Sequence, residues 1–165
     1  MATSSIKTAA PRTTKQPLDA VALLRADHKE VAALFAEYKT LRSPIKKKAL
    51  VTKICTSLSV HAQVEEEIFY PAVQKALKDR TLIPEAIVEQ QTMKDLISQV
   101  EGKEPDGDMF DAKIIVLAEY VTHHVKEEHS EMFPKAKATK LDLHALGAQM
   151  ATRKQELLAA RGAPR

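Results

Sequence analysis

From residue 18 onward, the apolar residues of this 165-residue chain recur at alternating steps of four and three. This spacing places them on one face of an α-helix, whereas a half-buried strand alternates at every second residue. The first such segment runs from Asp19, a predicted N-cap, to about Thr40. Its stripe consists of Leu24, His28, Val31, Phe35 and Tyr38. Because steps of four and three form the seam of a left-handed helical bundle, the pattern predicts packed helices.

The rest of the chain repeats this organisation. A second helix is expected to begin at Ser43-Pro44, a third near Pro84, and a fourth at Asp108 after the glycine- and proline-containing loop 101–108. A fifth, shorter helix is expected from Asp142 to about residue 160. Amphipathic helices joined by short loops predict an all-α fold, an up-down-up-down antiparallel four-helix bundle with a short fifth C-terminal helix.

Composition and charge further limit the fold class and the partners of the chain. Only 4 glycines, no tryptophan and 4% aromatic residues argue against an all-β fold. The net charge of +3 is carried by residues 1–17, which hold three basic residues and no acid, and this leaves 22 basic and 22 acidic residues from residue 18 on. We therefore predict a disordered basic tail at 1–17, a neutral bundle at 18–140 with no nucleic-acid partner, and a C-terminal helix and tail at 141–165.

The single cysteine, Cys55, has no partner for an internal disulfide, which is typical of a reducing compartment. No apolar run approaches the length of a membrane span, and the first 17 residues lack the apolar core of a secretory signal. These features predict a cytoplasmic protein with no membrane partner.

Five polar residues occupy seam positions where leucine or valine would be expected: His28, His61, Glu65, His124 and Glu128. Four of them belong to a repeat, because His61-x3-Glu65-x5-Pro71 recurs 63 residues later as His124-x3-Glu128-x5-Pro134. The prolines are expected to bend or end the regular helices. The repeat predicts a pseudo-symmetric bundle of two helix pairs.

Histidine and glutamate at i and i+4 lie one turn apart, so each pair can offer a nitrogen and an oxygen to one metal centre. A His-x3-Glu pair is more commonly a surface ion pair, but here the pair falls on the apolar seam twice. Burying an unpaired carboxylate is costly, and a bound cation would compensate two of them. We therefore predict a metal site in the bundle core.

These residues resemble the hemerythrin-like HHE cation-binding domains. The resemblance covers residues 18–140 and rests on Asp27-His28 with Val31 and Leu34-Phe35, on His61 to Pro71, and on His124 to Pro134. It implies a non-haem diiron centre with an oxo, hydroxo or water bridge. By that resemblance His28, His61 and His124 would be terminal ligands, and Glu65 and Glu128 would bridge two Fe ions.

The chain departs from the family pattern in its third helix, where Gln90 and Gln91 stand at the position of an expected histidine. An amide oxygen is a weak neutral donor for iron. The expected result is an asymmetric centre, with one ion well held by His28 and His61 and a second ion weakly bound or absent.

Other side chains near the predicted centre are accessory candidates. Glu66 and Glu127 could donate oxygen, whereas His129 could approach the second ion only if Pro134 distorts the helix. His123 is expected to be a rim residue, and Tyr38, Tyr70 and Tyr120 are expected to be core or rim aromatics.

The resemblance implies a protein that binds or senses O2, NO or peroxide at an open iron position. Two alternatives stay open, an iron-responsive interaction module and a metal-free helical interaction domain. The sequence indicates no particular protein partner and no organic-substrate pocket.

Overall fold

The computed structural model describes residues 16–162, and within that range it contains helices and no strand. The predicted tail falls mostly on residues 1–15, which lie outside the described residues. The long helices are α1 (Ala20–Tyr38), α2 (Pro44–Val64), α4 (Leu82–Val100), α5 (Asp108–Glu127) and α7 (Leu143–Ala160). The short ones are η1 (Glu65–Phe69), α3 (Tyr70–Ala76), η2 (Glu128–Met132) and α6 (Phe133–Lys137).

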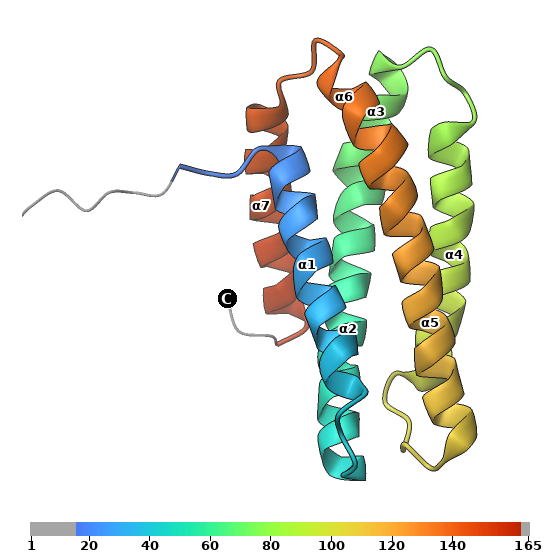
Figure 1. The fold of residues 1–165 in the computed structure, drawn as a ribbon. Helices are drawn as coiled ribbons and strands as arrows, with labels where there is room; N and C mark the ends of the chain where they lie inside the picture. Colours follow the sequence, from blue (N-terminus) through green and yellow to red (C-terminus); the bar gives the residue numbers. More distant parts are fainter. Residues whose placement is uncertain (1–15, 163–165) are drawn as a thin grey trace, which may run out of the picture.

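Helices α1, α2, α4 and α5 form an antiparallel bundle, with α3 and α6 extending α2 and α5 at one end (Figure 1). The prediction of an all-α up-down-up-down bundle is confirmed. Two apolar clusters fill the core, one around Ile54, Ile114 and Leu117 and the other around Phe69 and Phe133. The polar seam residues lie between these two clusters.

The predicted helix starts are capped as the sequence indicates. The Asp19 side chain accepts a hydrogen bond from the Ala22 amide at 2.8 Å, and Asp142 accepts one from the Ala145 amide at 3.0 Å. Ser43 accepts one from the Lys46 amide at 3.4 Å. Each side chain satisfies a backbone donor that the first turn of the helix leaves free.

The fifth helix begins and ends where the sequence predicts, although it is not a short one. Helix α7 has 18 residues, only one fewer than α1, and it packs along α1 and α2 on the outside of the bundle (Figure 1). Met150 is fully buried there, and Gly147 lies so close to α1 that a β-carbon would meet the backbone oxygen of Leu18 at 2.4 Å. The missing side chain of Gly147 therefore allows α7 to lie this close to the start of α1.

The two prolines of the repeat each follow a π-helical segment, in which η1 and η2 add an extra residue to the turn. A proline ring crowds the carbonyl four residues earlier, and a widened turn relieves that contact. The extra residue rotates the next turn, so Phe69, Tyr70 and Val73 are buried where regular spacing would have buried Ile68 and Ala72. This change of register brings Tyr70 to the core.

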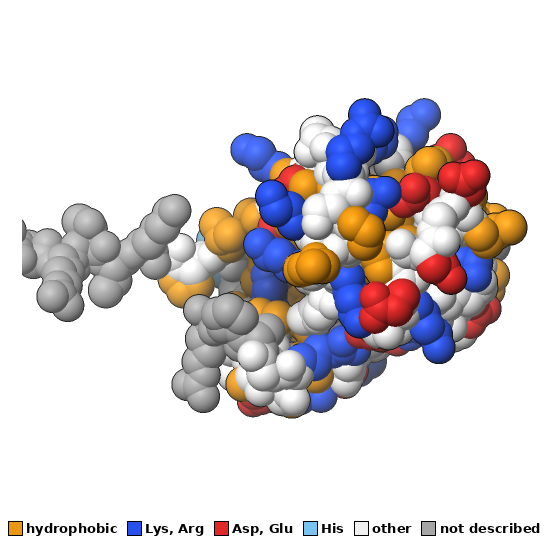
Figure 2. Space-filling model, turned by 90° about the horizontal axis from the view of Figure 1, so that it is seen from below, with side chains coloured by type: hydrophobic (Ala, Val, Ile, Leu, Met, Phe, Trp, Pro, Cys, Tyr) orange, Lys and Arg blue, Asp and Glu red, His pale blue; other side chains and the backbone are white. Residues whose placement is uncertain are grey.

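Within the described residues, no helix has both the length and the apolar character needed to cross a bilayer. At the end of the bundle drawn in Figure 2, basic and acidic side chains both occur at the surface. This mixture agrees with the balanced charge counted from residue 18 on.

Candidate metal centre

The five polar seam residues meet in the core. His28 comes from α1, His61 and Glu65 from the junction of α2 and η1, and His124 and Glu128 from the junction of α5 and η2. His28, Glu65, His124 and Glu128 are buried, and His61 retains a small exposed fraction. The helices thus project nitrogen and oxygen atoms into one small volume.

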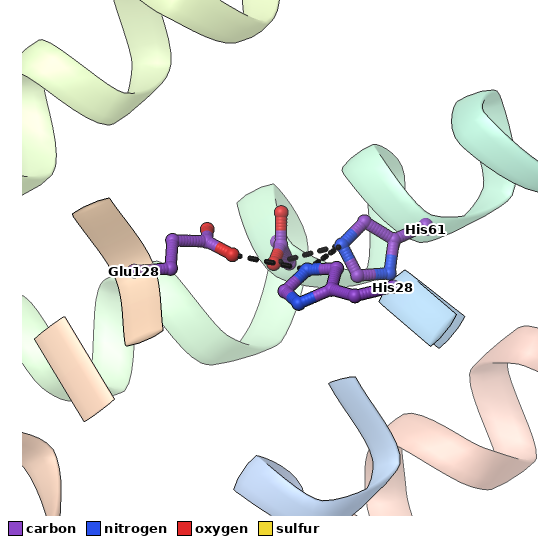
Figure 3. Close-up of side chains that lie close together, drawn as sticks. His28, His61 and Glu128 are labelled. Atoms are coloured by element: carbon purple, nitrogen blue, oxygen red, sulfur yellow. Dashed lines mark hydrogen bonds and ion pairs between the residues drawn. The ribbon is translucent and has the colours of Figure 1, made fainter. Parts of the chain in front are cut away.

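One set of donor atoms, here called the first half-site, consists of His28 Nε2, His61 Nε2, Glu65 Oε1 and Glu128 Oε2. The two nitrogens lie 3.1 Å apart. His61 Nε2 is 3.0 Å from Glu65 Oε1, and His28 Nε2 is 3.1 Å from Glu128 Oε2. Figure 3 shows His28, His61 and Glu128 pointing toward one another, and all four atoms lie within 4.8 Å of one another.

The other carboxylate oxygens belong to a second half-site, formed with Tyr70 and His124. The Tyr70 hydroxyl lies 2.7 Å from Glu128 Oε1, 3.1 Å from Glu65 Oε2 and 3.1 Å from His124 Nε2. His124 Nε2 is itself 3.1 Å from Glu128 Oε1. Each glutamate therefore presents one oxygen to each half-site, which is the arrangement of a carboxylate that bridges two cations.

These distances fit metal coordination. Ligands bound to one ion at about 2.1 Å in neighbouring positions lie about 3 Å apart. Glu65 Oε1 and Glu128 Oε2 are buried and accept no aligned hydrogen bond, although each lies close to an imidazole nitrogen. Buried polar atoms almost always have partners, so two unpartnered carboxylate oxygens facing two imidazoles suit a cation between them.

Protons on the same groups offset the charge when no cation is bound. Burial and the neighbouring Glu128 carboxylate raise the pKa of Glu65 to about 7. Burial opposes protonation of His124, but Glu128, Glu65 and Glu89 outweigh it and raise its pKa to about 9. Burial lowers the pKa of His28, which keeps an unprotonated nitrogen available to a metal.

Side chains behind the histidines orient their rings. His61 Nδ1 lies 3.0 Å from Asp27, and His124 Nδ1 lies 2.5 Å from Glu89. An N–H at Nδ1 that donates to a carboxylate leaves the lone pair of Nε2 pointing into the centre. The ammonium group of Lys154 on α7 in turn contacts Asp27 at 2.5 Å.

Gln90 occupies the seam of α4 as predicted and is 1% exposed. Its amide donates to Glu65 Oε2 and to the Tyr70 hydroxyl, and its Oε1 has no hydrogen-bond partner. Gln91 points away from the centre and bonds to Asp95. Of the two glutamines, Gln90 is therefore the one that lies at the centre.

The accessory candidates take different positions. Glu66 pairs with Lys94 at 2.6 Å, and Glu127 lies on the surface beside His123. His129 does not approach the second half-site, because its Nε2 lies 2.8 Å from His28 Nδ1, behind the first half-site. None of these three side chains supplies a donor atom to either half-site in the described structure.

Tyr70 is the site residue that the sequence reading missed. Aligning the two copies of the repeat pairs Tyr70 with Phe133, so one ring carries a hydroxyl and the other does not. Phe133 stacks on His28 with ring centroids 5.9 Å apart, while Tyr70 contacts His124. That difference between the copies was the available signal, and the Tyr70 hydroxyl is also the group to which Gln90 of α4 donates.

A cavity of about 450 Å³ adjoins the centre. His28, His61, Gln90 and His124 are among the residues that line it. Apolar side chains form much of its wall, including Leu58, Met93, Ile97 and Val121. The volume is within the range of small-molecule sites, so the centre has a connected space for an exogenous ligand.

The fold and the site define a helical-bundle protein with a buried histidine–carboxylate cluster suited to cations. The sequence profile of the Hemerythrin HHE cation binding domain matches residues 19–136. The chain belongs to this family.

Two known proteins resemble the chain. A DNA nickase of Nostoc sp. (strain PCC 7120 / SAG 25.82 / UTEX 2576) is 32% identical over 119 residues, which cover 72% of this chain and 34% of the nickase. The chain thus spans about a third of that relative's length. A crystal structure of a hemerythrin HHE cation binding domain-containing protein from Mycobacterium kansasii superposes with a TM-score of 0.75 at 22% identity, over 87% of this chain and 89% of that one. This likeness supports the fold.

Proposed function

We propose that the chain is a cytoplasmic non-haem diiron-type protein that binds or senses O2, NO or peroxide at an asymmetric centre. The observation that carries the proposal is the division of the Glu65 and Glu128 oxygens between two clusters of donor atoms. Two irons bound there would supply exchangeable coordination positions and redox chemistry. Histidine and carboxylate donors suit iron, and the adjoining cavity gives a small ligand access to the histidines.

The asymmetry has a structural basis in the donor sets. The first half-site holds two imidazoles, whereas the second holds His124 and the Tyr70 phenol. Burial and the Glu65 and Glu128 carboxylates raise the pKa of Tyr70 well above its ordinary value. The phenol must lose its proton to act as a strong ligand. The second ion should therefore bind more weakly than the first, and its affinity should increase as pH rises.

A second candidate function is an iron-responsive module that changes a protein-binding surface. One observation favours it, the chain of contacts from His61 through Asp27 to Lys154 on α7. A cation that reorients His61 would alter the attachment of α7. A chain that binds no iron would instead favour the metal-free interaction domain.

Anaerobic loading with Fe(II), followed by metal analysis and exposure to air or NO, tests the proposal. We expect two irons per chain, the second more easily removed by a chelator, and new near-ultraviolet and visible absorption on exposure. His61→Ala should lose iron from the first half-site. His144→Ala, which removes an exposed histidine of α7, is the matched control and should bind as wild type. Absence of bound iron in the wild type would refute the proposal.

A further inference from the structure

A second group of metal-binding side chains lies on the surface of α4 and α5, outside the buried centre. It consists of Glu89, His123 and Glu127, whose donor atoms all lie within 4.8 Å of one another. His123 Nε2 is 3.2 Å from Glu127 Oε1 and 3.5 Å from Glu89 Oε1. We refer to these three residues as the surface triad.

Two packed helices hold the surface triad. His123 and Glu127 are four residues apart on α5 and share one face of it, and Glu89 reaches them from the neighbouring helix α4. The side chains of Glu89, His123 and Glu127 are 25%, 60% and 42% exposed. Water can therefore complete the coordination shell of a bound ion.

The charge of the surface triad favours a cation. Among residues 16–162, Glu89 and Glu127 form ion pairs only with the imidazoles of His123 and His124, and no lysine or arginine joins them. Two carboxylates held near one imidazole repel each other when both are ionised. A divalent cation would remove that repulsion and use all three side chains as ligands.

We propose that Glu89, His123 and Glu127 form a surface site for one divalent transition-metal cation, distinct from the buried centre. One imidazole nitrogen and two carboxylate oxygens are a ligand set for ions such as Zn²⁺ or Fe²⁺. Two ligands bound to one ion at about 2.1 Å lie about 3.0 to 3.4 Å apart in octahedral or tetrahedral geometry, and the two distances from His123 to the carboxylates, 3.2 Å and 3.5 Å, are close to that range.

Glu89 joins this surface site to the buried centre. Its Oε2 lies 2.5 Å from His124 Nδ1, while its Oε1 faces His123. A cation bound at Oε1 draws charge from the carboxylate and weakens its hydrogen bond with His124. Occupancy of the surface site therefore lowers the affinity of the second half-site, and by linkage an ion at His124 lowers the affinity of the surface site.

Zn²⁺ binding to the full-length protein, measured by equilibrium dialysis and calorimetry, tests the proposal. We expect His123→Ala to lose one equivalent of Zn²⁺ relative to wild type, while His144→Ala loses none. Glu127→Gln should weaken the same equivalent at least tenfold. Circular dichroism verifies that each variant remains helical.

A second measurement separates this site from the buried one. In His61→Ala, which lacks a ligand of the first half-site, Zn²⁺ should still shift the imidazole NMR signals of His123. If His123→Ala binds as many Zn²⁺ ions as wild type with the same affinity, or if Zn²⁺ leaves the His123 signals unmoved, the surface site does not exist. Because His61→Ala removes a ligand of the first half-site and none of the surface triad, this result is independent of whether iron binds in the first half-site.

Discussion

One hydroxyl group distinguishes the two halves of the centre. Phe133 and Tyr70 occupy equivalent places in the repeat, but only the tyrosine offers an oxygen, and it faces the half-site that holds a single imidazole, His124. Gln90 supports that oxygen by donating to it at 3.0 Å. At this scale single atoms make the donor sets of the two half-sites different.

Tyr70→Phe should therefore reduce metal content toward one ion per chain while the bundle remains folded. The ring stays buried, and loss of the hydroxyl costs about 1 kcal/mol of folding stability through lost hydrogen bonds. Metal analysis and thermal unfolding check this. Equal metal content in wild type and variant would exclude Tyr70 as a ligand.

Asp27 lies behind His61, with its carboxylate 3.0 Å from His61 Nδ1. Asp27→Asn should weaken the first ion by about 10- to 100-fold, as loss of a carboxylate behind a histidine ligand commonly does. Lys154→Met, which removes only the ammonium group behind Asp27, is the control and should weaken binding of the first ion less. Competition against a calibrated chelator measures both, and an equal affinity in Asp27→Asn and wild type would contradict the assignment.

At the scale of the elements, the π-helical segments and α7 shape the site. Segments η1 and η2 turn Tyr70 and Phe133 inward. Helix α7 adds Lys154 behind Asp27 and covers α1 and α2. Neither contribution follows from the regular period of a helix. The π-helical segments interrupt that period, and the position of α7 depends on how it packs against the bundle.

Gly147→Ala should lower the free energy of unfolding by about 1–3 kcal/mol, because the added carbon would sit 2.4 Å from the Leu18 carbonyl oxygen. At a solvent-exposed position of a helix, replacing glycine by alanine would instead raise the free energy of unfolding by about 1 kcal/mol. Denaturant unfolding gives the sign, and a stabilised variant would show that α7 does not pack this closely on α1.

Asp111 joins three helices, since it accepts hydrogen bonds from Tyr38 of α1 at 2.5 Å and from Lys47 of α2 at 3.0 Å. The hydrogen bond from Tyr38, followed by that from Lys47, lowers its pKa below the ordinary value. Asp111→Asn should cost about 1 kcal/mol at pH 7, a figure reduced for the partial exposure of the carboxylate.

The pH dependence of that cost has a definite sign. A carboxyl with a lowered folded pKa stabilises the fold above its unfolded pKa, near 3.9, and loses the contribution as pH falls through the folded value. The difference in free energy of unfolding between wild type and Asp111→Asn should therefore be constant near neutral pH and should disappear below about pH 4. Urea titrations across pH measure it, and a gap that persists at low pH would contradict the role of the charge.

At the scale of the whole molecule, the buried glutamates couple folding to metal binding. The unfolded chain has no preformed site, so bound cations stabilise the fold. At a free metal concentration 100 times the Kd, the gain is about 2.7 kcal/mol, which corresponds to a rise in Tm of about 5–10 °C for a chain of this size.

Scanning calorimetry with and without Fe(II) under argon checks this rise. His61→Ala should show a smaller rise than wild type, whereas His144→Ala should show the full one. An unchanged Tm in the wild type at saturating Fe(II) would contradict the coupling.

The sequence by itself determined the helices, their order and the five polar seam positions, because a 3.6-residue period and its capping signals are local properties of the chain. It also predicted that a glutamine, Gln90 or Gln91, would face the centre from the third helix. Only the tertiary structure decided that Tyr70 enters the centre, that Asp27 and Glu89 lie behind the histidines, and that α7 packs against α1. Those contacts depend on the rotation and register of helices far apart in sequence, which the spacing within one helix does not specify.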